Sequence, residues 1–257
     1  MTVEDSIRDF YDQEGWAVDA DGRTVDERLF TDPRPAARAY GTLTRRRLLA
    51  HLPASGKRLL DAGSGPVQLP EYVEYGQRFD RHVCVDISAR ALEGAQARLG
   101  ARGEYVQASL LELPFPDDHF DAAVSSHVLY HVGAAGQDRA VREMLRVTRP
   151  GAPVLIVYTH DPLAPLRALL RPVKRRLRGQ PPPSLYVYSH PLRWWRRFAG
   201  VAAVTVLPFA VLRHDQSGKI PERALAPVLR AVTTLEERLP AVTVQIAAYP
   251  LIVLRKS

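Results

Sequence analysis

The stretch Leu60-Asp61-Ala62-Gly63-Ser64-Gly65-Pro66 decides the fold. The short apolar run 58–62 predicts a β-strand, and the two glycines predict a tight turn at its end. A glycine turn at the carboxyl end of a parallel strand lets the backbone approach a ligand closely, and the amides of the following helix can face its anionic groups. We therefore expect a nucleotide-like ligand at this turn.

Asp61 restricts the kind of ligand. Its carboxylate precedes the glycines, where it would repel a pyrophosphate but attract a cationic amino or sulfonium group. Gln68 stands where the Gly-x-Gly-x-x-Gly pattern of dinucleotide sites has its third glycine. The sequence thus disfavours a nicotinamide enzyme and favours a nucleoside that carries a positive charge.

Asp86 ends the second predicted strand, 23 positions after Gly63. A carboxylate at this place can accept two hydrogen bonds from ribose hydroxyls. It could instead cap the next helix, although Ser88 is the better capping residue. Following Asp-x-Gly-x-Gly at this distance, Asp86 is predicted to bind ribose.

Strand and helix patterns alternate outward from the glycine turn. They predict an α/β fold with a doubly wound, seven-stranded, mostly parallel sheet. Pro208 is expected to interrupt the sixth strand, and Pro227 to kink the last long helix or delay its start. We expect strands at 58–62, 81–87, 104–108, 120–125, 153–158, 201–212 and 247–255, and helices at 37–52, 89–99, 137–147 and 222–238.

Two further regions complete the predicted organisation. Residues 1–56 are expected to form an N-terminal helical cap, with Ile7, Phe10 and Tyr11 on one helical face. Residues 57–257 then form the main domain. Within it, the proline- and arginine-rich region of about 161–200 is predicted to be a lid inserted after the fifth strand, where the acceptor is recognised.

The bulk composition points to a cytoplasmic protein. Of the 257 residues, 46% are hydrophobic, and no apolar run is long enough to span a bilayer. The polar, acidic start does not resemble a secretory signal. Cys84 is the single cysteine, so a disulfide within the chain is excluded. We expect Cys84 to be a core residue.

Charge is unevenly distributed. Residues 1–32 hold ten acidic side chains, whereas residues 162–214 hold none and carry ten Lys and Arg. This basic region could contact an anionic partner, or it could be a solvated face. No nucleic-acid-binding module accompanies the charge, so nucleic acid is disfavoured.

Two groups of side chains in the basic region could recognise a partner. An amphipathic helix there could rest on an anionic membrane, or it could be an ordinary core-facing helix. Aromatic and basic residues beyond it could recognise a phosphate or a glycan. The first group comprises Leu166, Leu169, Leu170, Val173 and Leu177, and the second Tyr186, Tyr188, His190, Trp194 and Trp195 with Arg193, Arg196 and Arg197.

Five motifs in order resemble those of class I, Rossmann-like S-adenosylmethionine-dependent methyltransferases of the methyltransferase type 11 kind. They are Leu60–Pro66, Val85–Ser88, Leu113–Phe115, Phe120–Ser125 and Arg146–Gly151. The resemblance covers residues 57–160 and implies S-adenosyl-L-methionine as the cofactor.

The resemblance also implies cofactor-binding roles. Asp61 and the backbone of Gly63, Ser64 and Gly65 would hold the methionine end, Asp86 the ribose, and Ile87 the adenine. Ser109 stands where the family often has an acid facing the adenine amino group, so that contact would be weaker or made by backbone near Leu110. Tyr11 would close over the cofactor carboxylate, or else only pack on its own helix. Ser126 is expected to line the same site.

His127, Tyr130 and His131 follow the fourth strand, at the edge of the sheet where an acceptor would meet the sulfonium. If this segment is helical, the two histidines would share one side, and either could take a proton from the acceptor or be structural. Two histidines without a third ligand do not suggest a metal, so none is predicted.

The expected function is methyl transfer to a small molecule, sugar or glycolipid, with oxygen as the favoured acceptor atom. Two alternatives remain open at this point. One is a methyltransferase-fold enzyme that catalyses a non-methylating reaction. The other is a membrane-surface binding protein with a relict cofactor site.

Overall fold

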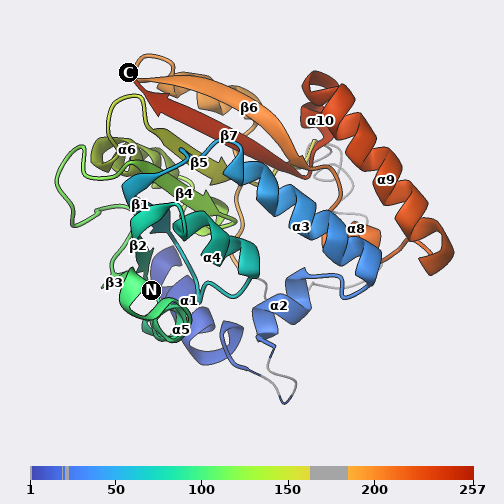
Figure 1. Cartoon of the computed structure of the whole chain (residues 1–257), viewed down its shortest axis with the longest axis horizontal. Helices are drawn as coiled ribbons and strands as arrows, with labels where there is room; N and C mark the ends of the chain where they lie inside the picture. The colour runs from blue at the N-terminus through green and yellow to red at the C-terminus, as the bar shows by residue number, and fades with distance from the viewer. Residues whose placement is uncertain (1, 19, 21–22, 163–184) are drawn as a thin grey trace.

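The computed structural model describes residues 2–18, 20, 23–162 and 185–257. Its seven-stranded sheet has the order β3-β2-β1-β4-β5-β7-β6 (Figure 1). The first five strands are parallel, whereas β7 is antiparallel to both β5 and β6. The predicted doubly wound, mostly parallel sheet is confirmed. The strands are β1 Gly56–Ala62, β2 Phe79–Asp86, β3 Gly103–Gln107, β4 Ala122–Ser126, β5 Pro153–Val157, β6 Ala202–Ala210 and β7 Tyr249–Lys256.

Helices cover both faces of this sheet, which explains why its central strands are apolar throughout. Helix α6 (Gln137–Val147) and the 3-10 segment η4 (Leu192–Phe198) pack on one face, with Leu60 and Val154. Helices α3 (Pro35–Leu49) and α9 (Glu222–Arg238) pack on the other, with Leu59 and Leu155. In Figure 1, α3 and α4 (Pro70–Gly76) lie in front of the sheet. Helix α5 (Ala89–Leu99) packs against Cys84 in β2, and the cysteine is buried as predicted.

The N-terminal segment lies over the carboxyl ends of the parallel strands. It comprises α1 (Val3–Phe10), the π-helical η1 (Tyr11–Gly15) and α2 (Val25–Phe30). Three side-chain hydrogen bonds connect this segment to the loops that follow β1, β2 and β3. The Thr24 hydroxyl donates to Gln68 at 2.8 Å. From the other side, the Ser88 hydroxyl donates to Asp12 and the Ser109 hydroxyl to Glu4, each at 2.5 Å. We call residues 2–31 the cap, since α3 belongs to the core.

Two prolines lie inside regular elements. Pro208 lies within β6, whose pairing with β7 continues past it with a register shift between Pro208 and Ala210. An edge strand tolerates proline because one of its sides needs no ladder hydrogen bond. Pro227 lies inside α9, which begins at Glu222, so the expected delayed start is wrong. Leu225 and Leu229 are buried around it, and this packing outweighs the low helix propensity of proline.

The predicted lid is described only in its second part. Residues 163–184, with the amphipathic pattern from Leu166 to Leu177, lie outside the described residues. From residue 185 the chain runs beside the loop after β4, where Tyr188 N donates to Tyr130 O at 2.9 Å. The remaining short elements are η2 Gly100–Arg102, η3 Leu129–His131, α8 His214–Ser217 and α10 Pro240–Ile246. Among the described helices, none has the length and apolar character that a bilayer crossing requires.

Candidate functional site

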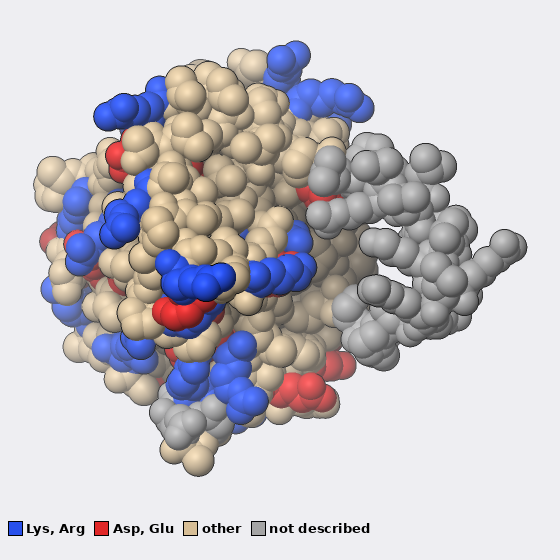
Figure 2. Space-filling model, turned by 90° about the vertical axis from the view of Figure 1, so that its right-hand side faces the viewer, with Lys and Arg blue, Asp and Glu red and all other residues tan. Residues whose placement is uncertain are grey.

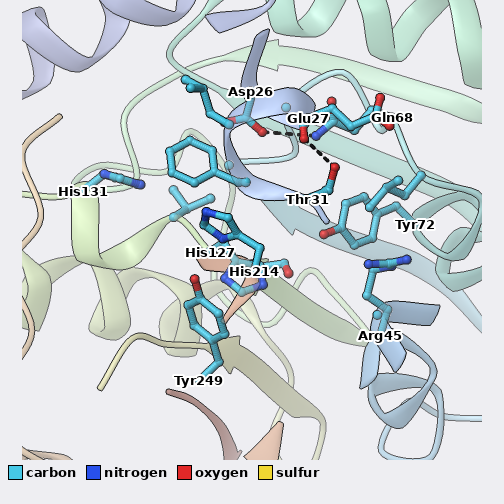
Figure 3. Close-up of a pocket in the computed structure, with 18 of the residues that line it drawn as sticks. Asp26, Glu27, Thr31, Arg45, Gln68, Tyr72, His127, His131, His214 and Tyr249 are labelled. Carbon is cyan, nitrogen blue, oxygen red and sulfur yellow. Dashed lines mark hydrogen bonds between the residues drawn. The ribbon is translucent and has the colours of Figure 1, made fainter. Parts of the chain in front are cut away.

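A cavity of about 1060 Å³ lies between the cap and the carboxyl ends of β1, β2 and β4 (Figure 3). Its walls include the glycine turn, Asp86, the loop after β4, and residues from α2, α3, β6 and β7. Ligand pockets usually measure roughly 300–1,000 Å³. The cavity is therefore large enough to hold a nucleoside cofactor together with a second small molecule.

The glycine turn forms one wall, and its geometry requires glycine. Gly63 and Gly65 have φ values of +76° and +55°, in the left-handed region. A Cβ atom on Gly63 would lie 2.5 Å from the Val128 side chain, and one on Gly65 would lie 3.2 Å from Trp16 of the cap. Gly63 N also donates to Val85 O at 2.7 Å. The turn is thus held closely between β2, the loop after β4 and the cap.

Asp86 lies in the wall next to this turn. Its two carboxylate oxygens accept the Gly65 and Ser88 amide protons, each at 2.9 Å. Burial raises the pKa of Asp86 to about 6, although these two hydrogen bonds act in the opposite direction. Ser88 caps α5 by accepting from Ala91 N at 3.0 Å, so the capping role belongs to Ser88 as expected. Ile87 lines the cavity beside Asp86.

Asp61, by contrast, lies inside the sheet and not in the cavity wall. Its side chain is buried in the sheet and does not line the cavity, and its Oδ2 atom lies 3.0 Å from His82 Nε2. Asp61 is the neighbour of Cys84 across β1 and β2, and such neighbours point to the same face of a sheet. Asp61, His82 and Cys84 together form a cluster of possible metal ligands. Burial and the Asp61 carboxylate raise the pKa of the Cys84 thiol, so this cluster of possible metal ligands contains a protonated thiol.

The region expected to contact adenine contains a carboxylate from the cap. Ser109 does not line the large cavity; its hydroxyl donates to Glu4 Oε1 at 2.5 Å and accepts from Leu111 N at 3.0 Å. Glu4 and Leu110 do line the cavity. The sequence indicated a missing acid at position 109, and the structure places an acid from α1 beside that position.

Tyr11 also lines the cavity, from η1. Its ring stacks on Trp16 with centroids 4.7 Å apart, and its edge faces His131 at 6.4 Å. The Tyr11 ring is therefore part of the cavity wall, beside the glycine turn that Trp16 covers.

His127 follows β4 and has a φ of 64°, which is rare for a residue with a side chain. Its ring is surrounded by aromatic rings, with centroid distances of 4.6 Å to Tyr249, 5.8 Å to Phe209 and 6.3 Å to Tyr130. No described residue forms a hydrogen bond with its ring nitrogens, and the side chain lines the cavity. Burial, aided by the positive charge of Arg45, lowers the pKa of His127 to about 3, so the ring is neutral at physiological pH.

His131 is held by a different contact. Its Nδ1 lies 2.8 Å from the Tyr186 carbonyl, and because a carbonyl only accepts, Nδ1 carries the proton and Nε2 has a lone pair. Burial lowers the pKa of His131, although the hydrogen bond to Tyr186 opposes this. The two histidines do not share a helical face, because the segment is not one helix: η3 spans only Leu129–His131, and His127 precedes it in a left-handed conformation. Tyr130 and Ser126 line the cavity between them.

Several cavity residues were not predicted from the sequence. Most come from α2, α3, α4, α8 and β7, which are distant from one another along the chain, and Gln68 comes from the loop between β1 and α4. Arg45 is paired with Glu71, with Nε and Oε2 3.0 Å apart. Figure 3 labels Asp26, Arg45, Gln68, Tyr72, His214 and Tyr249 from this group around His127 and His131.

The aromatic cluster expected to recognise a sugar or phosphate does not face this cavity. Trp195 is fully buried in the core, and Trp194 stacks on His190 at 4.2 Å and lies under Arg197 at 4.8 Å. From this part of the chain, Leu185 and Val187 line the cavity instead. On the face seen in Figure 2, Lys and Arg form several separate groups divided by uncharged surface.

Comparison with known sequences identifies the domain. The family model described as "Methyltransferase domain" matches residues 60–156. The ubiquinone/menaquinone biosynthesis C-methyltransferase UbiE of Vibrio campbellii is 35% identical over 114 residues, which are 42% of this chain and 43% of that protein. An uncharacterized methyltransferase of Mycobacterium marinum is 34% identical over 147 residues, 53% of this chain and 56% of that protein. The chain thus matches about half the length of these curated relatives.

Solved structures share the whole fold. Geranyl diphosphate C-methyltransferase from Streptomyces coelicolor A3(2), in complex with Mg²⁺, geranyl diphosphate and S-adenosyl-L-homocysteine, has a TM-score of 0.62 at 15% identity, covering 100% of this chain and 99% of that one. Magnesium protoporphyrin IX methyltransferase from Synechocystis PCC 6803, with bound S-adenosylmethionine, has a TM-score of 0.61 at 13% identity, covering 100% and 98%. Residues 60–156 therefore match a methyltransferase domain, and the chain shares its fold with solved methyltransferases that bind S-adenosylmethionine or S-adenosyl-L-homocysteine.

Proposed function

We propose that this chain transfers a methyl group from S-adenosylmethionine to a small-molecule acceptor bound in the 1060 Å³ cavity. The observation that carries the proposal is that one cavity contains both the glycine turn with Asp86 and the aromatic-lined His127. Methyl transfer requires the acceptor atom to lie in line with the methyl–sulfur bond, and a shared cavity makes this alignment possible.

The residues around the glycine turn suit the cofactor. Asp86 has carboxylate lone pairs left for ribose hydroxyls beyond its two backbone hydrogen bonds. Ile87 and Leu110 offer apolar surface for a base, and Glu4 can accept from an exocyclic amino group. The left-handed Gly63 and Gly65 bring backbone close to the methionine arm. When bound, the cofactor supplies an activated methyl group with a neutral thioether as its leaving group.

The acceptor would occupy the part of the cavity that His127 faces. Tyr72, Tyr130, Phe209 and Tyr249 offer aromatic surface there, which suits the ring or apolar body of a sugar, glycolipid or specialised metabolite. For a hydroxyl acceptor, the neutral His127 ring would accept the proton while the new carbon–oxygen bond forms. His131 Nε2 is the alternative proton acceptor, since its other nitrogen is bound to Tyr186. We therefore propose O-methylation, with His127 as the first candidate for the base.

Methylation of carbon is the second candidate. Two of the proteins to which this chain is similar are named C-methyltransferases. An electron-rich carbon needs less help from a strong base, and the low pKa of His127, about 3, makes this histidine a weak one.

A single experiment separates these functions. The wild type is incubated with S-adenosylmethionine labelled with carbon-13 in the methyl group and with a panel of phenols, sugars, quinol precursors and a prenyl diphosphate. Release of S-adenosylhomocysteine shows turnover, and the carbon-13 NMR shift of the product shows whether the methyl group is on oxygen or carbon. Cofactor binding with no labelled product from the panel or from a small-molecule cell extract would contradict methyl transfer and favour a non-methylating reaction.

A further inference from the structure

Asp26, from the first turn of α2, places a carboxylate in the cavity without a cationic partner. Its Oδ2 accepts from Gln68 Nε2 at 3.3 Å. Across the described part of the chain, no Lys, Arg or His forms an ion pair with it. Burial raises the pKa of Asp26 to about 6, whereas hydrogen bonds from Gln68 and Tyr11 lower it and the Glu27 carboxylate adds to the rise. A partly buried carboxylate of this kind is stabilised by a ligand cation.

The cap holds Asp26 on the cofactor side of the cavity. Gln68, which follows the glycine turn, is bound to both Asp26 and Thr24 of the cap. Tyr11 interacts with Asp26 and, at longer range, with Asp86. The Tyr11 ring stacks on Trp16, and Trp16 lies over Gly65. Asp26 therefore belongs to the group of residues around the glycine turn, whereas His127 belongs to the group around Tyr249 (Figure 3).

Several other acids in or near the cavity have different partners from those of Asp26. Asp61 is bound to His82 inside the sheet and does not reach the cavity. Glu27 is paired with Arg23 at 3.1 Å, and Glu71 with Arg45 at 3.0 Å. Asp86 accepts two backbone amides. Unlike Glu27 and Glu71, Asp26 thus accepts only from neutral side chains, those of Gln68 and Tyr11.

The aromatic stack beside Asp26 adds to the attraction for a cation. A positive charge over the face of Tyr or Trp is attracted by the ring, and the attraction is stronger when both groups are shielded from water. S-adenosylmethionine carries two positive charges, an ammonium and a sulfonium, and one carboxylate. A carboxylate beside an aromatic stack suits either of the two cations.

We propose that Asp26 is the counter-charge for the cationic methionine arm of the cofactor, so that the cap completes the cofactor site in the role the sequence suggested for Asp61. This inference rests on the proposed function, since it assumes that the cofactor binds at the glycine turn. Asp26 acts by binding and orienting the cofactor.

The test compares three ligands by calorimetry: S-adenosylmethionine, S-adenosylhomocysteine, which lacks the sulfonium, and 5′-methylthioadenosine, which lacks the amino-acid arm and both cations. They are titrated into the wild type, Asp26→Asn and Asp26→Glu. Asp9→Asn is the matched control, because it removes an exposed acid of the cap away from the cavity. Thermal unfolding of each variant shows whether it is folded.

In Asp26→Asn, we expect affinity for S-adenosylmethionine to fall about tenfold or more, as for the loss of a charge-assisted contact. Affinity for 5′-methylthioadenosine should stay within about twofold, and Asp26→Glu should retain part of the lost affinity. An equal loss for S-adenosylhomocysteine assigns Asp26 to the ammonium, and a smaller loss assigns it to the sulfonium.

Three results would overturn the proposal. One is unchanged affinity for S-adenosylmethionine in Asp26→Asn, with or without a loss of turnover. Another is an equal loss for all three ligands, since this would indicate a structural role. The third is an equal loss in Asp9→Asn, which would indicate a general effect of charge on the cap. A wild type that binds none of the ligands would instead contradict the proposed function itself.

Discussion

The carboxylate of Asp61 and the imidazole of His82 form a hydrogen bond of 3.0 Å between Oδ2 and Nε2, inside the sheet. Both side chains are buried, and His82 Nδ1 has no partner in the described part of the structure. An acid that precedes a glycine turn in the sequence therefore serves here within the core, beneath the turn. The Asp61 carboxylate is thus bound to His82 in the core and does not line the cavity.

Asp61→Ala is expected to lower stability more than it lowers cofactor affinity. The change leaves His82 Nε2 buried without a partner, which costs about 1–3 kcal/mol of unfolding free energy, measured by urea denaturation. The double variant Asp61→Ala/His82→Leu should recover part of this loss, since no unpaired polar group remains. If Asp61→Ala instead keeps full stability and loses cofactor binding, the carboxylate acts in the cavity.

Gly63→Ala is expected to abolish tight cofactor binding. Gly63 has a φ of +76°, and a Cβ atom would lie 2.5 Å from Val128. Gly151→Ala is a matched control, because Gly151 has a φ of +74° and open space around its Cβ position. Both variants should lose about 1–2 kcal/mol from the left-handed backbone, but only Gly63→Ala should distort the turn and weaken binding. Equal affinities in the two variants would show that the turn does not touch the cofactor.

His127→Asn is expected to reduce turnover while leaving cofactor affinity within about twofold. Asparagine tolerates the left-handed backbone at this position, so the fold should persist. Loss of a proton acceptor costs roughly 10²–10⁴-fold in rate, whereas a carbon acceptor that needs no base would show a smaller effect. His119→Asn, which removes a histidine stacked on Phe115 outside the cavity, serves as the control. Full turnover in His127→Asn would remove His127 from the reaction.

Cofactor affinity is expected to fall as the pH decreases through 6. The pKa values of Asp26 and Asp86 are both raised to about 6, so both carboxylates are ionised above this pH and neutral below it. A neutral Asp26 no longer attracts a cation, and a neutral Asp86 is a poorer hydrogen-bond acceptor. The other groups facing Asp26 do not reverse the trend: burial raises the pKa of Tyr11, Glu27 is paired with Arg23, and Gln68 is neutral.

The check is a calorimetric titration between pH 8 and 5. Each group that must be ionised can weaken binding by up to about tenfold per pH unit below its pKa. Asp26→Asn should show a shallower profile than the wild type, because one of the two carboxylates with a raised pKa is then absent. A flat profile, or tighter binding in acid, would contradict the assignment of these carboxylates.

Much of the fold and part of the site could be predicted from the sequence. Asp86 and Ser88 are adjacent to the end of a strand, so local patterning placed the first in the cavity wall and the second at a helix cap. Asp26 and Tyr249 enter the cavity from segments far apart along the chain, and no local periodicity connects them. Trp195 was expected at a binding surface because it lies among arginines in the sequence. It is instead fully buried, because its ring packs in the core.

Binding of S-adenosylmethionine at the glycine turn and Asp86 underlies every role proposed above. Calorimetric titration of the wild type, Asp86→Ala and the exposed control Asp80→Asn, on the same strand, tests this. We expect the wild type and Asp80→Asn to bind one equivalent in the range of about 1 μM to 1 mM, and Asp86→Ala to bind at least about tenfold more weakly. Absence of binding by the wild type, or equal affinity in all three proteins, would contradict the account.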